Sequence, residues 1–328
     1  MNAIPKPTKE QIEQAAKLVA AMRGQIAKAI VGQDEVIEQT LVALLAAGHL
    51  LVEGVPGLGK TLLVLAVAKT FDGKFGRIQF TPDLMPADVT GHALYDPVTR
   101  GFTTRQGPVF TNLLLADEIN RAPAKTQSAL LQVMQEGQVT IDGVEHALAP
   151  PFMVLATQNP IEQEGTYSLP EAQLDRFLLK VRIDYPTAAD ELRMARQVTT
   201  GKVGDRLNVE QVATLARPEA VLALQAITAA LTVDDAVADY AVRLARATRT
   251  WPGVAAGAGP RGGIALIRAA RAAALLAGRD FVIPDDVKRM ALPALRHRVM
   301  PAPELEIEGQ SSDQLLSAML AKVEAPRT

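Results

Sequence analysis

The sequence of 328 residues contains no cysteine. Disulfide bonds, thiolate metal ligands and cysteine nucleophiles are therefore excluded. Histidine is also scarce, and the four residues are too scattered to match the spacing of metal ligands; they are His49, His92, His146 and His297. For this reason we do not expect a structural metal site.

The sequence also lacks a strong charge of one sign and a long apolar run. The net charge of −2 at pH 7 provides no global basic field that would attract nucleic acid or an anionic membrane. The longest apolar run, residues 41–52, is too short to cross a bilayer, and the first residues lack the apolar core of a signal peptide. The sequence therefore predicts a cytoplasmic protein without a membrane span.

A glycine-rich stretch at residues 54–61 fits the pattern of Gly, four residues, Gly-Lys and Ser or Thr. It follows a short apolar segment, residues 50–52, and precedes a predicted helix over residues 62–69. Backbone N–H groups and a helix N-terminus surround anionic phosphates in such a loop. The residues that we predict to contact the nucleotide here are Gly54, Pro56, Gly57, Leu58, Gly59, Lys60, Thr61 and Leu62.

Two acids follow the apolar run of residues 113–116, which has the composition of a strand buried on both faces. With a phosphate loop upstream, Asp117 is predicted to hold Mg²⁺, through water, together with the Thr61 hydroxyl. Lys60 supplies positive charge at the β- and γ-phosphates. Glu118 is then the candidate general base that orients the attacking water.

Three further polar residues are weak signals by themselves. Asn159 follows the apolar segment 152–156 and could contact the γ-phosphate or the water held by Glu118, although Asn-Pro also commonly opens a turn. Without further context, Arg176 and Arg261 would each be interpreted as a surface residue or as a member of an ion pair.

The order of the predicted elements indicates an α/β fold with a doubly wound parallel sheet, followed by a smaller helical domain. Predicted strands at residues 50–52, 77–81, 113–116, 152–156 and 178–183 alternate with helices. Asp142-Gly143 predicts a hairpin over residues 139–146. From Pro186 onward only helical periods are convincing. We therefore place a domain boundary between residues 185 and 186, which gives domains 1–185 and 186–328.

Taken together and in order, these motifs resemble the AAA+ ATPases, and within them the MoxR family. The blocks that carry the resemblance are residues 30–33, 54–61, 79–83, 117–122, 156–160, 169–177, 260–261 and 296–298. They extend over nearly the whole chain, from about residue 10 to about residue 300. One departure is mild: glycines surround Pro260-Arg261, where the family more often has a serine before Pro-Arg.

The resemblance implies roles for individual residues. It assigns Lys60 and Thr61 to Walker A, Asp117 and Glu118 to Walker B, Asn159 to sensor 1, Arg176 to the arginine finger, Arg261 to sensor 2, and Val31 and Gly32 to the adenine pocket. It also assigns residues 82–110 to the helix-2 insert and the hairpin to the pre-sensor-1 insert, which engage partners. The implied cofactors are ATP and Mg²⁺.

An arginine finger acts on a neighbour's nucleotide, so the resemblance implies a homo-oligomeric ring, expected to be a hexamer. It leaves open whether Arg261 acts on its own nucleotide or on the neighbour's. The biological role that the resemblance implies is chaperone-like remodelling or metal-cofactor maturation of a client protein. In this role the protein would act with a separate von Willebrand A domain protein.

Two alternatives remain open from the sequence. One is a magnesium-chelatase-type motor subunit, and the other is a nucleotide-gated scaffold with little turnover, which intact Glu118 and Arg176 disfavour. A nucleic-acid face among the arginines of residues 243–298 is disfavoured, because only Trp251 and Phe281 could supply stacking there.

Overall fold

The computed structural model describes residues 5–55, 57–98, 100–158, 167–200 and 209–326. Its centre is a five-stranded parallel sheet in the order β2-β5-β8-β1-β9. The strands are β1 (Leu50–Glu53), β2 (Phe75–Gln79), β5 (Leu113–Asp117), β8 (Met153–Gln158) and β9 (Leu179–Arg182). Residues of β5 and β8 are almost entirely buried, as expected for central strands with helices on both faces.

Alternate residues of the central strands enter two separate hydrophobic clusters. Leu113 and Leu115 of β5 pack on one face, against α1 (Lys9–Ala29), α2 (Asp34–Leu45) and α3 (Lys60–Thr70). Leu114 and Ala116 pack on the other face, against α5 (Ala124–Glu136). This alternation follows from the two-residue period of a strand, and it confirms the predicted doubly wound α/β fold.

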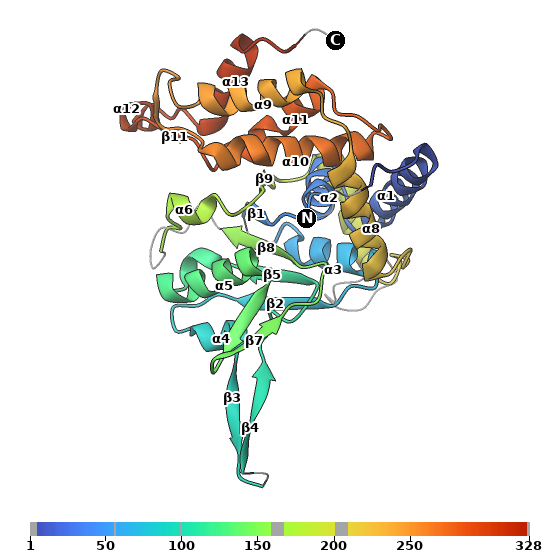
Figure 1. The fold of residues 1–328 in the computed structure, drawn as a ribbon, viewed down its shortest axis with the longest axis vertical. Helices are drawn as coiled ribbons and strands as arrows, with labels where there is room; N and C mark the ends of the chain where they lie inside the picture. Colours follow the sequence, from blue (N-terminus) through green and yellow to red (C-terminus); the bar gives the residue numbers. More distant parts are fainter. Residues whose placement is uncertain (1–4, 56, 99, 159–166, 201–208, 327–328) are drawn as a thin grey trace.

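Two insertions leave the sheet as hairpins. The first comprises α4 (Pro86–Thr90), β3 (Gly91–Asp96) and β4 (Gly101–Gln106), and it projects from the end of the molecule opposite the C-terminal helices (Figure 1). The second pairs β6 (Gln138–Ile141) with β7 (Val144–Ala147). Asp142 and Gly143 both have positive φ at its turn, as the Asp-Gly signal predicts.

The C-terminal part is helical, as predicted. It contains α7 (Ala188–Thr199), α8 (Pro218–Ala230), α9 (Asp235–Ala247), α10 (Pro260–Leu276), α11 (Pro284–Leu295), α12 (Pro303–Ile307) and α13 (Ser312–Lys322). A short ribbon of β10 (Val254–Ala256) and β11 (Met300–Pro301) joins them and was not predicted, because its strands are too short to show a period. Helix α8 contacts α1 and α2, so the helical part and the sheet share one apolar cluster. The boundary at residues 185–186 remains a prediction.

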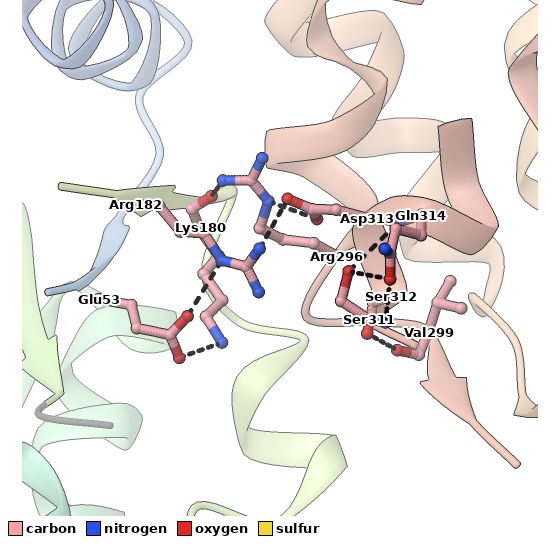
Figure 2. Close-up of polar contacts among 9 residues, drawn as sticks. All are labelled: Glu53, Lys180, Arg182, Arg296, Val299, Ser311, Ser312, Asp313 and Gln314. Atoms are coloured by element: carbon pink, nitrogen blue, oxygen red, sulfur yellow. Dashed lines mark hydrogen bonds and ion pairs between the residues drawn. The ribbon is translucent and has the colours of Figure 1, made fainter. Parts of the chain in front are cut away.

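Ionic contacts also join the sheet to the helical part (Figure 2). Glu53, the last residue of β1, pairs with Lys180 (2.7 Å) and Arg182 (3.2 Å) of β9. Arg182 in turn pairs with Asp313 of α13 at 2.9 Å, and Asp313 pairs with Arg296 at 3.0 Å. A line of charge therefore extends from the strand before the glycine-rich loop to the C-terminal helices.

No helix in the described ranges is long and apolar enough to cross a membrane.

His49 connects α5 to the sheet. Because its imidazole is buried, we expect the stability of the protein to depend on pH. Its Nε2–H donates to the Met134 carbonyl at 2.9 Å, and its Nδ1 accepts from the Val154 N–H at 3.1 Å. Burial lowers the pKa of His49 from 6.5 to about 4, with a further lowering by Arg268, although the bond to Met134 opposes this. Protonation is therefore easier in the unfolded chain than in the folded one.

The stabilisation that neutral His49 contributes should thus be fully present above pH 6.5. The free energy of unfolding should fall by about 2 to 3 kcal/mol as the pH decreases from 6.5 to 4. Urea unfolding followed at a series of pH values measures this slope. The His49→Gln variant, which cannot titrate in this range, should show a shallower slope. An unchanged slope in that variant would contradict the assignment.

Candidate active site

The glycine-rich loop connects β1 to α3, and its backbone takes the conformation that a phosphate site needs. Gly57 and Gly59 have φ of 86° and 77°, where a side chain would be strained. Gly59 is the N-cap of α3, which begins at Lys60. At Gly54 a Cβ atom would lie 2.6 Å from the Ile183 carbonyl oxygen, so the neighbouring strand end also requires glycine. The N-terminus of α3 is therefore open to an anion.

A cavity of about 370 Å³ lies at this helix N-terminus. It is lined by Gly57, Gly59, Lys60, Thr61, Leu62, Arg77, Gln79, Asp117, Glu118 and Thr157. The fold thus brings seven of the residues predicted from the sequence to one cavity. Gly54 and Leu58 do not line it; Leu58 packs partly buried against the hydrophobic core. Pro56 and Asn159 lie outside the described residues.

Lys60 is held within the loop itself. Its Nζ donates to the carbonyl of Gly54, and burial lowers its pKa, while the charges of Asp117 and Glu118 act in the opposite direction. The ammonium group therefore lies among the acids and the loop backbone. Such a group gains from an anionic ligand that completes its hydrogen bonds.

Thr157, at the end of β8, connects the two acids. Its buried hydroxyl donates to Asp117 Oδ1 at 2.7 Å and accepts from the Glu118 N–H at 2.8 Å. Glu118 itself has a φ of 57°, a conformation that non-glycine residues rarely adopt and that requires support from its surroundings. The sequence analysis assigned Thr157 no role, although a polar residue at the end of an apolar strand is a recognisable signal.

Strand β2 contributes two further side chains that the sequence analysis missed. Arg77 Nη2 donates to Asp117 Oδ2 at 2.8 Å, and Gln79 Nε2 donates to Glu118 Oε2 at 2.7 Å. Arg121 also pairs with Glu118 Oε2, at 3.2 Å. The alternation of Arg77 and Gln79 along one face of a strand is the signal that could have identified them. Each acid thus has a donor from the neighbouring strand.

Replacement of Thr157 by valine should lower nucleotide turnover about tenfold or more, because the loss of one positioning hydroxyl displaces both acids. Steady-state kinetics on the purified variant measures this effect. The matched control is Thr228→Val, since Thr228 is similarly buried and its hydroxyl, within the described part of the chain, bonds only the Leu224 carbonyl of its own helix. Equal losses in both variants would indicate a general packing effect and contradict the positioning role.

The two predicted arginines lie elsewhere. Arg176 and Arg261 line a second cavity of about 410 Å³, together with Asp175, Arg268 and Arg298. Among the residues that the structure describes, none lines both the 410 Å³ cavity and the phosphate-loop cavity. Arg176 Nη1 donates to the Leu131 carbonyl at 2.6 Å, and its buried Nε has no partner among the described residues. Arg261 is about half exposed, with 52% of its side chain accessible.

Val31 and Gly32 are also outside the phosphate-loop cavity. Gly32 has a φ of 72°, and a Cβ atom there would contact Asp190 of α7 at 2.8 Å. The adjacent Gln33 donates to the Asp184 carbonyl at 3.0 Å. Since residue 184 is the second residue after β9, the neighbour of β1, the segment 31–33 lies beside the strand ends that carry the loop.

The residues present fit a magnesium nucleotide. Positive-φ glycines and the N-terminus of α3 suit phosphate groups. Thr61 and Asp117 offer the oxygen ligands that Mg²⁺ prefers, and few protein ligands are needed because this ion keeps several waters and bonds to phosphates.

Comparisons with known proteins agree with this fold and site. Residues 49–179 match the family described as "ATPase family associated with various cellular activities (AAA)", and residues 246–318 match the AAA lid domain. The chain is thus an AAA ATPase-type protein with a helical lid.

Similar relatives extend over nearly the whole chain. An uncharacterized protein YeaC of Bacillus subtilis is 46% identical over 92% of both chains. Chaperone MoxR1 of Mycobacterium tuberculosis is 44% identical over 92% of this chain and 81% of its own. A crystal structure of a provisionally assigned ATPase from Cytophaga hutchinsonii has a TM-score of 0.89 at 41% identity, over 97% of this chain and 98% of that one. The chain belongs to the MoxR family of AAA+ ATPases.

Proposed function

We propose that this protein hydrolyses ATP with Mg²⁺ as its cofactor. The observation that carries the proposal is the convergence of Lys60, Thr61, Asp117 and Glu118 on one cavity at the N-terminus of α3. A cation, a hydroxyl, a metal-binding carboxylate and a second carboxylate that can accept a proton are the groups that phosphoryl transfer to water needs.

The roles of the residues follow from their chemistry. Bound Mg²⁺ neutralises charge on the β- and γ-phosphates. Thr61 and Asp117, the latter through water, would hold this ion, and Lys60 would exchange the Gly54 carbonyl for phosphate oxygens. Glu118 would accept a proton from the water that attacks the γ-phosphorus. The bond between the γ-phosphorus and the oxygen that bridges it to the β-phosphate would break, and ADP would leave with that oxygen. Gln79 and Arg121 both contact Oε2 of this carboxylate.

Two further contacts are proposed for the nucleotide. Val31 and Gly32 would contact the adenine, because their segment lies beside the end of β9 and the start of the loop. Asn159 follows Gln158 at the end of β8, which pairs with β1 and β5, and would contact the γ-phosphate or the attacking water.

We also propose that Arg176 and Arg261 both act on the nucleotide of a neighbouring subunit. Their shared cavity is separate from the phosphate-loop cavity of the same chain. A guanidinium group can stabilise the transferred phosphoryl group only by touching it. A homo-oligomeric ring, expected to be a hexamer, brings the second cavity of one subunit to the first cavity of the next.

The proposed output is the remodelling or metal-cofactor maturation of a client protein in the cytoplasm, together with a separate von Willebrand A domain protein. A relative that is named as a chaperone, MoxR1, supports remodelling. The projecting hairpin of β3 and β4 supports contact with a partner, because it exposes four large apolar side chains; they are Leu94, Tyr95, Val98 and Phe102. Tyr95 and Phe102 form an edge-to-face pair at 5.5 Å near its tip.

The direct test is phosphate release by the purified protein with ATP, with and without Mg²⁺, alongside light scattering. We expect release that needs Mg²⁺ and a scattering mass well above that of one chain. A protein that remains monomeric at micromolar concentration with ATP and Mg²⁺ would contradict the ring. Binding of ATP without any release would instead support the scaffold alternative.

A further inference from the structure

Three consecutive residues at the end of α11 extend from the lid into the core. Arg296, His297 and Arg298 all have polar contacts with residues 175–180, which comprise the turn after α6 (Glu171–Leu174) and the start of β9. The side chain of Arg298 is only 3% exposed and that of Arg296 is 9% exposed. Charged groups are rarely buried to this degree unless their partners compensate them fully.

Arg298 bonds the backbone on both sides of Arg176, the residue that we propose as the arginine finger. Its Nη2 donates to the carbonyls of Asp175 (3.1 Å) and Phe177 (2.7 Å), the residues on either side of Arg176. Its Nη1 donates to the Leu178 carbonyl at 3.3 Å and also to that of Ala294. The turn that carries Arg176 is thus held by a guanidinium group from the lid, with His297 Nε2 bonded to the Phe177 carbonyl at 3.1 Å.

Asp175 connects Arg298 to the other arginine of the cavity. Its Oδ1 accepts from Arg298 Nε at 2.7 Å, while its Oδ2 lies 3.8 Å from Arg261 Nη1. One carboxylate therefore joins the buried Arg298 to the half-exposed Arg261, and the next residue along the chain is Arg176. All four side chains line the same cavity. The planar fork of Arg298 suits this task, because it bonds the carboxylate and several carbonyls at fixed angles.

The neighbouring Arg296 has a different set of partners. It bonds Asp313 of the lid and the Lys180 carbonyl of β9, in the ionic line that extends to Glu53 (Figure 2). Within the described residues, Arg296 bonds none of residues 175–178. The contacts with the turn that carries Arg176 therefore come from Arg298 and His297, and the charged contact comes from Arg298.

From these contacts we infer that Arg298 is a positioning residue, which holds Arg176 and Arg261 of the same subunit in register for the nucleotide of the next subunit. The inference rests on the proposed action of these two arginines between subunits. Arg298 touches no nucleotide itself. Because a displacement of about 1 Å in a positioned group costs about 100-fold in rate, loss of Arg298 should lower turnover strongly while the subunit's own nucleotide pocket stays intact.

The experiment mixes two inactive variants. Subunits with Arg298→Met keep the pocket with Glu118 but misplace the arginines. Subunits with Glu118→Gln keep the arginines but have an inactive pocket. After co-assembly in equal amounts, roughly a quarter of the wild-type turnover should return, since about one interface in four joins an intact pocket to intact arginines. Alone, Arg298→Met should lower kcat about 100-fold and leave KM for ATP unchanged.

A parallel mixture of Arg176→Ala with Glu118→Gln separates the two proposals. If this mixture regains turnover and the Arg298→Met mixture does not, the role of Arg298 is overturned while action between subunits stands. If neither mixture regains turnover, action between subunits fails, and the inference about Arg298 fails with it. Recovery in both mixtures supports both proposals.

Two further variants keep the test decisive if Arg298→Met does not fold. Asp175→Asn removes the shared charge but keeps the shape, and it should lower kcat and regain turnover in the same mixture. Arg279→Met is the matched control, because Arg279 forms an ion pair with Asp286 at 2.6 Å within the lid and does not line the cavity. It should lower the melting temperature without lowering kcat. A lowered kcat in this control would contradict a role specific to Arg298.

Discussion

Replacement of Arg176 by alanine is expected to lower the rate of ATP hydrolysis about 1000-fold, because an arginine finger contributes at least this much to phosphoryl transfer. Nucleotide affinity should stay nearly unchanged. Arg176 does not line the phosphate-loop cavity of its own subunit, and the one hydrogen bond that its side chain makes within the described residues is to the Leu131 carbonyl. Phosphate release and fluorescent-nucleotide binding measure the two quantities separately.

The control for this variant is Arg243→Ala. Arg243 is half-buried, and it bonds Asp239 within α9 and the Glu324 carbonyl, far from the proposed site in the sequence, so its loss should leave both rate and affinity at wild-type values. Light scattering with ATP and Mg²⁺ must show that the Arg176 variant still assembles. If nucleotide affinity fell together with the rate, Arg176 would have to be reassigned to its own subunit's pocket.

Replacement of Glu118 by glutamine is expected to lower turnover at least about 100-fold, because the amide cannot accept the proton of the attacking water. Binding of ATP should persist, since Lys60, Thr61 and Asp117 are unchanged. Glutamine has nearly the same shape, and the backbone at Glu118 stays anchored by its N–H bond to Thr157. Single-turnover measurements should show that the bound ATP is retained rather than released.

Glu219→Gln is a suitable control, because Glu219 is an exposed acid in the first turn of α8. It should behave as the wild type in every assay. Hydrolysis at an undiminished rate in the Glu118 variant would show that another group activates the water. Because this variant should retain ATP, it is also the form best suited to capture a client protein.

Much of the fold could be predicted because its signals are local. The run at residues 113–116 is apolar at every position, which is typical of a strand covered on both faces, and it forms β5 in the centre of the sheet. Asp142-Gly143 predicts a turn by its backbone preferences alone, and the hairpin of β6 and β7 forms there. The ribbon of β10 and β11 was missed, since three and two residues are too few to show a period.

The candidate site divides in the same way. Lys60, Thr61, Asp117 and Glu118 could be named because each follows a strand or begins a helix in a recognisable motif. Arg77, Gln79 and Thr157 could not be assigned to the acids, since their contacts depend on the pairing of β5 with β2 and with β8. Strand pairing joins residues about 40 positions apart, and no local pattern encodes which residues will face each other.

The sequence by itself predicted a phosphate-binding loop at residues 54–61 and named acids and arginines as candidates to act on a bound nucleotide. Only the tertiary structure decided how these groups are distributed: the acids meet the loop, whereas Arg176 and Arg261 line a separate cavity. The physical reason is that a motif specifies the backbone of a few residues, while the position of a side chain relative to another segment depends on packing across the whole fold.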